Sequence, residues 1–360
     1  MSAATPLRTA LLGYGSVSQV FHVPLLRALP EFRLVAAASQ NPQTPAALPE
    51  AQVFATPEAL LAGSDAELVV VATPNRTHFA LARAALESGR HVLVEKPFTL
   101  TVGEAQALVT LAQERGLVLS VFQNRRWDGD FLTLQQVLAG RELGRVTALH
   151  SHFDRFRPQV RDRWRESDEP GAGIWYDLGP HLVDQALTLF GLPRRVRADL
   201  ARMRSGARSD DHAEVTLDYS DTGGERRVTL HASMLTAYAA PRFVAHGTAG
   251  SFVIEGLDPQ EEALKAGETP GAPGWGLGAP DGRLFSGQGE RAVPRLPGDY
   301  PAFYRALAAA IREGSPPPVT PQQALDTMRV LVAAQRSQDQ GGWVSLEPAA
   351  PPARALDSDL

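Results

Sequence analysis

The chain has 360 residues, 44% hydrophobic and 21% charged, which is typical of a globular protein long enough for two domains. Its formal net charge of -5 gives no electrostatic reason to expect nucleic acid or an anionic membrane surface as a partner. It contains no cysteine, which excludes disulfides, thiolate metal sites and a cysteine nucleophile. No stretch approaches the roughly 20 apolar residues of a membrane span, and the first residues lack a signal-peptide pattern, so we expect a cytoplasmic protein.

The N-terminal third alternates short apolar runs with amphipathic stretches. The apolar runs predict strands at residues 9–12, 33–38, 68–72, 91–94 and 118–122, and the stretches between them predict helices such as 77–87 and 102–114. This rhythm predicts a doubly wound parallel sheet, because parallel neighbours need a crossover helix.

The turn after the first predicted strand, residues 13–18, has the sequence GYGSVS. Gly13 would allow a tight turn, and Gly15 would let the backbone approach a pyrophosphate at the start of the next helix. A GxG is weak evidence by itself, but this position directly after a strand predicts a dinucleotide site rather than a plain loop. The residues expected to bind the cofactor here are Gly13, Tyr14, Gly15, Ser16 and Val17.

The second strand ends at Ser39, Gln40 and Asn41, where an acidic residue would normally bind the ribose hydroxyls of NAD. Without a carboxylate, a 2′-phosphate would meet no repulsion, yet no arginine completes an NADP pocket. The cofactor is therefore NADP or NAD, with a slight preference for NADP.

Two further strand ends are expected at the cofactor, because ligands of open parallel sheets bind beyond the carboxyl ends of the strands. The expected residues are Thr73, Pro74, Asn75 and His78 after one strand, and Glu95 and Lys96 after another. A packing or helix-surface role explains His78 at least as well as cofactor contact. Pro97 ends the second of these strands.

The alternation changes at QNRRWD, residues 123–128, which predicts a domain boundary. We expect an NAD(P)-binding Rossmann domain in 1–124, a substrate-binding and oligomerisation domain in 125–346, and a mobile tail in 347–360. A helix at 131–138 and a long strand at 147–156 should follow the boundary. Five arginines lie between residues 155 and 165, and the interleaved acids Asp154, Asp162 and Glu166 favour ion pairs over a polyanion site.

The stretch GAGIWYDLGPHLVD, residues 171–184, carries the most specific chemistry. Pro180 suits the first position of a helix, which would place His181 in its first turn and Asp177 just before it. A histidine beside a carboxylate is an oriented proton acceptor, which alcohol oxidation requires when hydride leaves the same carbon. The pair could equally be a helix cap and a core histidine.

The remaining chain predicts strands at 213–219, 227–232, 242–245 and 251–255, and closing helices at 300–313 and 321–335. The segment 267–299 is rich in glycine and proline. We expect irregular structure there, over a sheet edge or near a subunit contact.

These motifs together resemble the Gfo/Idh/MocA family of NAD(P)-dependent sugar and polyol dehydrogenases, over nearly the whole chain. The matching segments are GYGSVSQVFH, ATPNRTHF, VLVEKPFTL, QNRRWD, GAGIWYDLGPHLVD and HGTAGSF. The resemblance implies an α/β fold with a doubly wound Rossmann domain and a C-terminal α/β domain on an open, mostly antiparallel sheet. Segments such as SHFDRFRPQVRDRWRE and LFGLP resemble the scyllo-inositol dehydrogenase-type branch. Ser18 and the missing acid near Gln40 depart from the family pattern.

The resemblance implies that Lys96 binds and polarises the substrate oxygen, His181 shuttles the proton, and Asp177 orients His181 or the substrate. Substrate contacts are expected from these three and from Asn124, Arg125, Trp127, Asp154, Arg155, Trp164 and Tyr176. We therefore expect hydride transfer, without a metal, between nicotinamide and a secondary alcohol of a cyclic polyol or sugar, with scyllo-inositol as a candidate. Reduction of a keto-sugar or another carbonyl is an alternative, and a non-enzymatic cofactor-binding sensor is a weaker one. We expect a homo-oligomer, a dimer or a tetramer.

Overall fold

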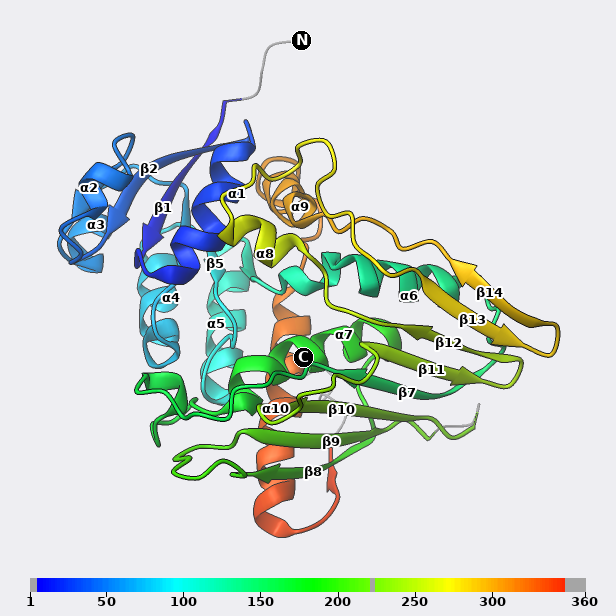
Figure 1. Cartoon of the computed structure of the whole chain (residues 1–360). Helices are drawn as coiled ribbons and strands as arrows, with labels where there is room; N and C mark the ends of the chain where they lie inside the picture. The colour runs from blue at the N-terminus through cyan, green and yellow to red at the C-terminus, as the bar shows by residue number, and fades with distance from the viewer. Residues whose placement is uncertain (1–4, 221–223, 347–360) are drawn as a thin grey trace, which may run out of the picture.

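The computed structural model describes residues 5–220 and 224–346, and Figure 1 shows two sheets with helices packed around them. The first sheet has six strands in the order β3-β2-β1-β4-β5-β6, and all of its neighbouring strands pair in parallel. Its strands are β1 (Leu7–Leu12), β2 (Phe32–Ala38), β3 (Gln52–Phe54), β4 (Leu68–Val71), β5 (His91–Val94) and β6 (Leu119–Val121). The predicted doubly wound sheet is confirmed, and its order is that of a Rossmann fold.

Helices cover both faces of this sheet, as parallel strands require. They are η1 (Ser18–His22), α1 (Val23–Ala28), α2 (Thr44–Ala47), α3 (Pro57–Gly63), η2 (Asn75–Thr77), α4 (His78–Glu87) and α5 (Val102–Arg115). The start of α5 is specified locally, because Thr101 and Glu104 form a reciprocal capping box. Its end is specified by Gly116, which has a φ of 62° that a side chain would disfavour.

The second sheet has nine strands in the order β14-β13-β12-β11-β7-β10-β9-β8-β15. They are β7 (Val146–His152), β8 (Arg195–Ala201), β9 (His212–Asp218), β10 (Arg227–Ser233), β11 (Phe243–Gly247), β12 (Gly250–Ile254), β13 (Gly282–Ser286), β14 (Gly289–Val293) and β15 (Val344–Ser345). Among the described strands of this second sheet only β7 and β10 pair in parallel, so the predicted mostly antiparallel sheet is confirmed.

The helices of this half are η3 (Asn124–Trp127), α6 (Gly129–Ala139), η4 (Trp164–Glu166), α7 (Ile174–Phe190), α8 (Gln260–Lys265), α9 (Tyr300–Glu313) and α10 (Pro321–Gln340). In Figure 1, α6 and α7 lie over one face of the sheet. The strands alternate accordingly: Val228 and Leu230 are buried, whereas Thr229 and His231 are partly exposed on the other face.

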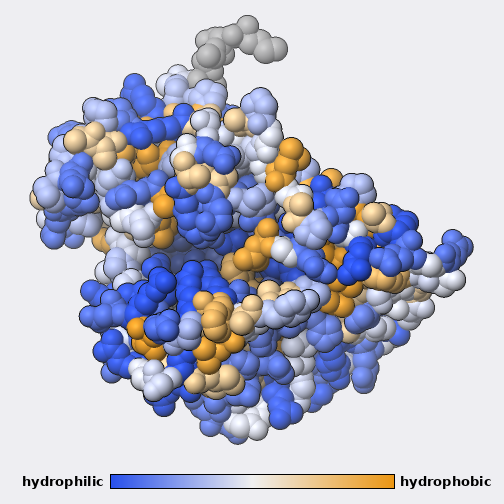
Figure 2. Space-filling model, viewed as in Figure 1, coloured by the Kyte–Doolittle hydropathy of each residue, from blue (hydrophilic) through white to orange (hydrophobic). Residues whose placement is uncertain are grey.

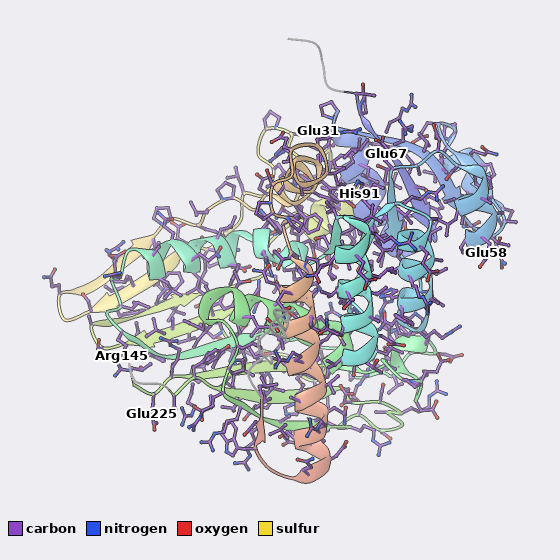
Figure 3. The ribbon with its side chains drawn as sticks, turned by 180° about the vertical axis from the view of Figure 1, so that it is seen from behind. Glu31, Glu58, Glu67, His91, Arg145 and Glu225 are labelled. Atoms are coloured by element: carbon purple, nitrogen blue, oxygen red, sulfur yellow. The ribbon has the colours of Figure 1, made fainter. Side chains whose placement is uncertain are left out.

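The last two helices, α9 and α10, contact both the parallel-sheet half and the antiparallel-sheet half of the chain. Helix α10 packs on α7 and β8 and also on α5 and β6, and Figure 3 shows it beside α5. The hydroxyl of Ser120 on β6 donates to the carbonyl of Val319 at 2.9 Å, and α9 packs on α1. The boundary near residue 124 stays a prediction, and these contacts show that the halves share one packed interior.

Some predicted elements were wrong. The strand expected at 147–156 ends at His152, and only an isolated bridge joins Phe156 to Leu235. The segment 267–299 is not irregular throughout, because residues 282–293 form the β13–β14 hairpin at the edge of the sheet. The predicted mobile tail, 347–360, lies outside the described residues. No described helix is long and apolar enough to cross a bilayer.

Candidate active site

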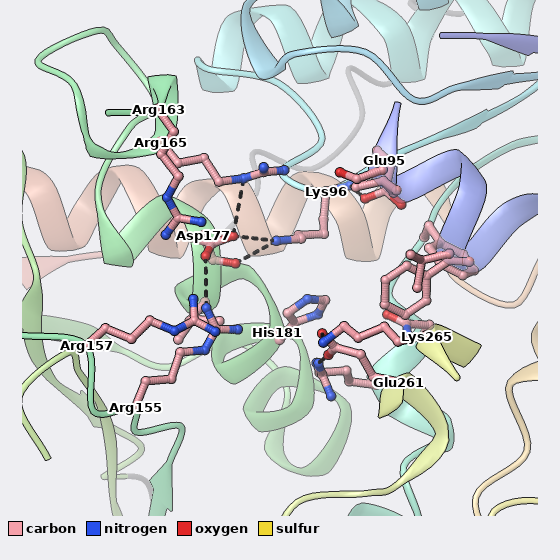
Figure 4. Close-up of a pocket in the computed structure, with 18 residues that line it drawn as sticks. Glu95, Lys96, Arg155, Arg157, Arg163, Arg165, Asp177, His181, Glu261 and Lys265 are labelled. Carbon is pink, nitrogen blue, oxygen red and sulfur yellow. Dashed lines mark hydrogen bonds and ion pairs between the residues drawn. The ribbon is translucent and has the colours of Figure 1, made fainter. Parts of the chain in front are cut away.

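A cleft opens between the two sheets, visible in Figure 2 as a hollow lined with hydrophilic side chains. It holds about 290 Å³ of space open to water-sized molecules. The turn after β1, the ends of β5 and β6, the start of α7, helix α8 and the segment 155–165 all contribute side chains (Figure 4). It lies beyond the carboxyl ends of the parallel strands, which is where a Rossmann sheet binds its ligand.

Lys96 and Asp177 meet across this cleft from the two halves of the chain. The ammonium of Lys96 donates to the carbonyl oxygen of Asp177 at 2.7 Å and to its carboxylate at 3.2 Å (Figure 4). Strand β5 positions Lys96, because its apolar residues are buried and the chain leaves the sheet directly after Val94. The cation is therefore held where a ligand's oxygen could reach it.

Glu95 supports this strand end from behind. Its carboxylate bonds the imidazole of His22 at 2.9 Å and accepts from the backbone N–H of Lys96 at 3.0 Å. Burial alone would raise the pKa of Glu95, but the hydrogen bond from His22 and the charges of His22 and Lys96 lower it overall. Both carboxylate oxygens have protein partners, so Glu95 fixes the position of Lys96 although it also lines the cleft.

Two arginines share the carboxylate of Asp177 with Lys96. The guanidinium of Arg155 lies 3.5 Å from one oxygen of Asp177, and that of Arg165 lies 3.6 Å from the other. Burial would raise the pKa of Asp177, but Lys96, Arg155 and Arg165 together hold it far below the usual range. Asp177 is thus a permanent anion that organises three cations and is a poor base.

Helix α7 carries Asp177 and His181 on one face, four residues apart, but it begins earlier than predicted. Its first residue is Ile174, so Asp177 lies in the first turn and Pro180 lies inside the helix. Gly173, with a φ of 94°, turns the chain into the helix, and the carboxylate of Asp210 accepts from the backbone N–H of Trp175 at 2.7 Å. The placement of Pro180 at the first helical position is wrong because this start is capped by a residue from a distant segment.

His181 is buried, and its Nδ1 has no hydrogen-bond partner among the described residues. Burial and the nearby charges of Lys96 and Arg125 lower the pKa of His181 well below its usual value, although Asp177 acts in the opposite direction. No hydrogen bond in the described structure joins Asp177 to His181. The imidazole is therefore neutral near pH 7 and can accept a proton.

The turn after β1 fits a dinucleotide. Gly13 has a φ of 96°, and a Cβ there would lie 2.6 Å from the carbonyl oxygen of Ala72, so only glycine closes this turn without strain. A Cβ on Gly15 would meet nothing within 4 Å, so its backbone faces open space. Ser18, in place of the third glycine, donates to the carbonyl of Gly13 at 2.7 Å and stabilises the turn. Ser16 and Val17, where the helix begins, line the cleft.

The other predicted cofactor residues fall into two groups. Ser39 and Asn41 hold a local turn, since Ser39 accepts from the hydroxyl of Thr44 at 2.8 Å and Asn41 accepts from the backbone N–H of Gln43. This turn and Gln40 have exposed surface and offer no carboxylate. The predicted contact from His78 is wrong, because its buried ring packs inside with both nitrogens at backbone carbonyls, of Pro97 at 2.8 Å and of Thr73 at 2.9 Å.

Thr73, Pro74 and Asn75 follow β4 beside the second half of the chain. The hydroxyl of Thr77 donates to that of Thr73 at 2.7 Å, and the side-chain amide of Asn75 donates to the carbonyl of Gly171 at 3.1 Å. Asn75 also lines a small pocket next to the main cleft. These residues therefore connect the turn after β4 to the start of α7.

The predicted substrate residues are only partly brought together. Asn124, Arg125 and Arg155 line the main cleft, and Trp164 and Tyr176 line the small neighbouring pocket with Lys96 and Asp177.

Two predicted substrate residues lie elsewhere. Trp127 packs edge-on against Phe303, with ring centroids 5.4 Å apart. Asp154 is bonded to His231 on the opposite face of the second sheet, because neighbouring residues of an extended segment point to opposite sides and Arg155 takes the cleft side.

Several cleft residues were missed by sequence reasoning, namely Arg157, Arg163, Arg165, Glu261 and Lys265. The expected ion pairing holds for Arg163, whose partner Glu166 lies 2.7 Å away. The arginine run itself was the available signal, and its alternate residues turn out to face the cleft. Glu261 and Lys265 gave no local signal, because helix α8 reaches the cleft only through tertiary packing on η1.

The comparisons with known proteins agree with this geometry. Residues 7–123 match the family model described as the NAD-binding Rossmann fold of the Gfo/Idh/MocA oxidoreductase family, and residues 135–346 match its C-terminal alpha/beta domain. The chain is 48% identical to the uncharacterized oxidoreductase YdgJ of Escherichia coli, over 90% of this chain and 94% of that one. It is 35% identical to the scyllo-inositol 2-dehydrogenase (NADP(+)) IolW of Bacillus subtilis, over 95% and 96%.

A solved oxidoreductase structure from Bacillus cereus superposes with a TM-score of 0.86 at 31% identity, covering 96% of this chain and all of that one. The family models together span most of the chain, and they include the turn after β1 and both partners of the Lys96–Asp177 pair. The chain therefore belongs to the Gfo/Idh/MocA family of NAD(P)-dependent oxidoreductases.

Proposed function

We propose that this chain transfers a hydride between NADP(H) and a secondary alcohol or ketone of a cyclic polyol, with scyllo-inositol as the first candidate. The observation that carries the proposal is the approach of the Lys96 cation and the neutral imidazole of His181 in one cleft beside the turn after β1. The substrate class is supported by the likeness to IolW, whose name gives both the substrate and NADP. The chain's own polar cleft suits a hydroxyl-rich ring.

His181 and Lys96 divide the proton chemistry between them. In the oxidation direction the neutral imidazole of His181 accepts the hydroxyl proton, and the ammonium of Lys96 stabilises the negative charge that develops on the same oxygen. A nicotinamide bound beside the turn after β1 would supply the acceptor for the hydride that leaves the carbon. Asp177 keeps Lys96 in place through the two hydrogen bonds at 2.7 and 3.2 Å. In the reduction direction the same groups act in reverse.

Side chains around the cleft would then select the ring. Phe21, Val20 and Leu178 provide an apolar wall, and Asn124 and Arg125 provide polar groups on the side of the junction. A ring with hydroxyls around its rim and carbon on its faces matches such a surface. A short alcohol would leave these polar groups without partners, at a cost of about 1–3 kcal/mol for each group left unpaired.

The test is a cofactor-reduction screen of inositols and pyranoses with NAD⁺ and NADP⁺, together with oxidation of NADH and NADPH by the matching ketones. We expect turnover on scyllo-inositol or a close cyclic polyol, faster with NADP⁺, and none on ethanol or 2-propanol. Lys96→Met, which keeps the length of the side chain without its charge, should lose turnover while still binding the cofactor. Failure of every inositol, pyranose and keto form would refute the substrate class, and full activity of Lys96→Met would refute the mechanism.

A further inference from the structure

Five of the nine histidines lie on β7, β9, β10 and β11, and two of them meet Asp154. On β7, Leu149 and Ser151 are buried beneath the helices, whereas His152 points to the opposite face, which carries no helix in the described chain. The parallel pairing of β7 with β10 places His231 directly beside His152. Asp154, two residues beyond His152, therefore continues the same face.

The three side chains converge on one point. The Nδ1 of His231 lies 2.8 Å from one carboxylate oxygen of Asp154, and the Nδ1 of His152 lies 3.5 Å from the other. One ligand atom from each of the three residues falls within 4.8 Å of the others. Ligand atoms of a tetrahedral ion, each about 2.0–2.1 Å from the metal, would be about 3.3 Å apart. The observed separations thus require only small rotations of the two rings.

Burial and charge also suit a cation. The side chain of Asp154 is 2% exposed and forms the floor, while the imidazoles of His152 and His231 are 23% and 18% exposed and form the rim. The carboxylate of Asp154 lies between the two imidazoles, with one oxygen toward each ring, so it would place its negative charge beside the ion. An ion could enter from solvent between the rings.

A hydrogen-bonded triad without any ion would be a simpler explanation for this cluster. The environment of the Nδ1 of His152 argues against it. The Nδ1 of His152 is buried and has no hydrogen-bond partner in the described structure, although it faces a carboxylate oxygen. A triad that served only to bond the carboxylate would use this nitrogen as a donor. A buried imidazole nitrogen that lies beside a carboxylate oxygen without a hydrogen bond is instead a position that a metal ion would fill.

We propose that His152, Asp154 and His231 bind one divalent transition-metal ion, best matched by Zn²⁺, with water filling the remaining position. Two imidazole nitrogens and one carboxylate oxygen are ligands that zinc accepts, and they do not suit Ca²⁺ or Mg²⁺, which prefer oxygen only. The ion would join β7 to β10 just before Arg155, whose guanidinium meets Asp177 on the other face. It takes no part in hydride transfer, and this proposal is independent of the substrate proposed above.

The experiment uses the full chain with any histidine tag removed and metals stripped by EDTA. Zn²⁺ is titrated by calorimetry, and Co²⁺ is titrated by visible absorbance, which reports the coordination of the ion directly. We expect one saturable Zn²⁺ equivalent per chain, Co²⁺ bands of a four- or five-coordinate site, and a higher melting temperature with Zn²⁺ present. Absence of a saturable equivalent, or a Co²⁺ spectrum of the hydrated ion alone, would overturn the proposal.

Three variants assign the ligands. Asp154→Asn, His152→Gln and His231→Gln should each weaken Zn²⁺ binding at least tenfold, with circular dichroism confirming the fold. The matched control is His246→Gln. His246 lies near His150 on the same face, with ring centroids 6.1 Å apart, but among the described residues it belongs to no group of three possible metal ligands. Binding that is unchanged in the three variants, or lost only in His246→Gln, would refute this site.

Discussion

Replacement of His181 by glutamine tests the proposed proton transfer most directly. The change keeps a polar side chain of similar reach on α7 but removes the group that accepts the proton. General-base catalysis contributes roughly 10²–10⁴-fold, which corresponds to about 2.7–5.4 kcal/mol of transition-state stabilisation at 1.36 kcal/mol for each factor of ten. We expect a loss near the upper end, because Asp177 cannot substitute: three cations hold its pKa far below that of a useful base.

The assay is the pH dependence of kcat for oxidation of the substrate found in the screen. Because burial and neighbouring cations lower the pKa of His181 well below its usual value, the wild-type rate should be flat through pH 7–8 and should fall only at a pH well below 6.5. His181→Gln should lose this acid limb as well as most of its turnover, with little change in cofactor affinity. The control is His246→Gln, which removes an exposed histidine of the second sheet. Turnover within tenfold of wild type, or an acid limb that persists in the variant, would refute the reasoning.

Three further changes follow from the same geometry. Ser39→Asp introduces a carboxylate after β2, and its repulsion of a 2′-phosphate should weaken NADP binding at least tenfold relative to NAD binding. Equal weakening of both cofactors in a fluorescence titration would contradict the proposed position of the ribose. Gly15→Val fills the open face of the turn, so the Kd for either cofactor should rise at least tenfold while the melting temperature of the cofactor-free protein stays the same. An unchanged Kd would exclude pyrophosphate binding at this turn. His181 stays neutral in the fold but takes up a proton in the unfolded chain, so the free energy of unfolding should decrease as pH falls below about 6.5, and His181→Gln should show a smaller decrease over that range in urea titrations.

The sequence predicts best those elements whose causes are local. Strand β5 has the predicted bounds, His91–Val94, because a run of apolar residues closed by two charges and Pro97 is sufficient to define it. The start of α7 was predicted incorrectly for the opposite reason. Its cap is Asp210, a residue from the segment before β9, so nothing near Pro180 indicates that the helix begins at Ile174.

Site residues that lie in a recognisable sequence motif could be predicted. Site residues that reach the cleft only through tertiary packing could not. Lys96, Asp177 and His181 follow from two short segments, and all three line the cleft. Asp154 and Arg155 were assigned together, although the alternation of an extended segment should have separated them. The residues of α8 could not be predicted, since their place at the cleft depends on packing between segments more than 200 residues apart.

The contacts of α10 have a consequence for the order in which the chain can fold during synthesis. Strand β6 and helix α5 leave the ribosome early, but the surface against which α10 packs stays uncovered until residues 321–340 have emerged. The surface of α5 and β6 that α10 covers therefore stays exposed to water while about 200 further residues are synthesised. A fragment that stops at the junction would keep this surface permanently, which makes the isolated half prone to aggregation and makes the two halves partners in a single cooperative unit.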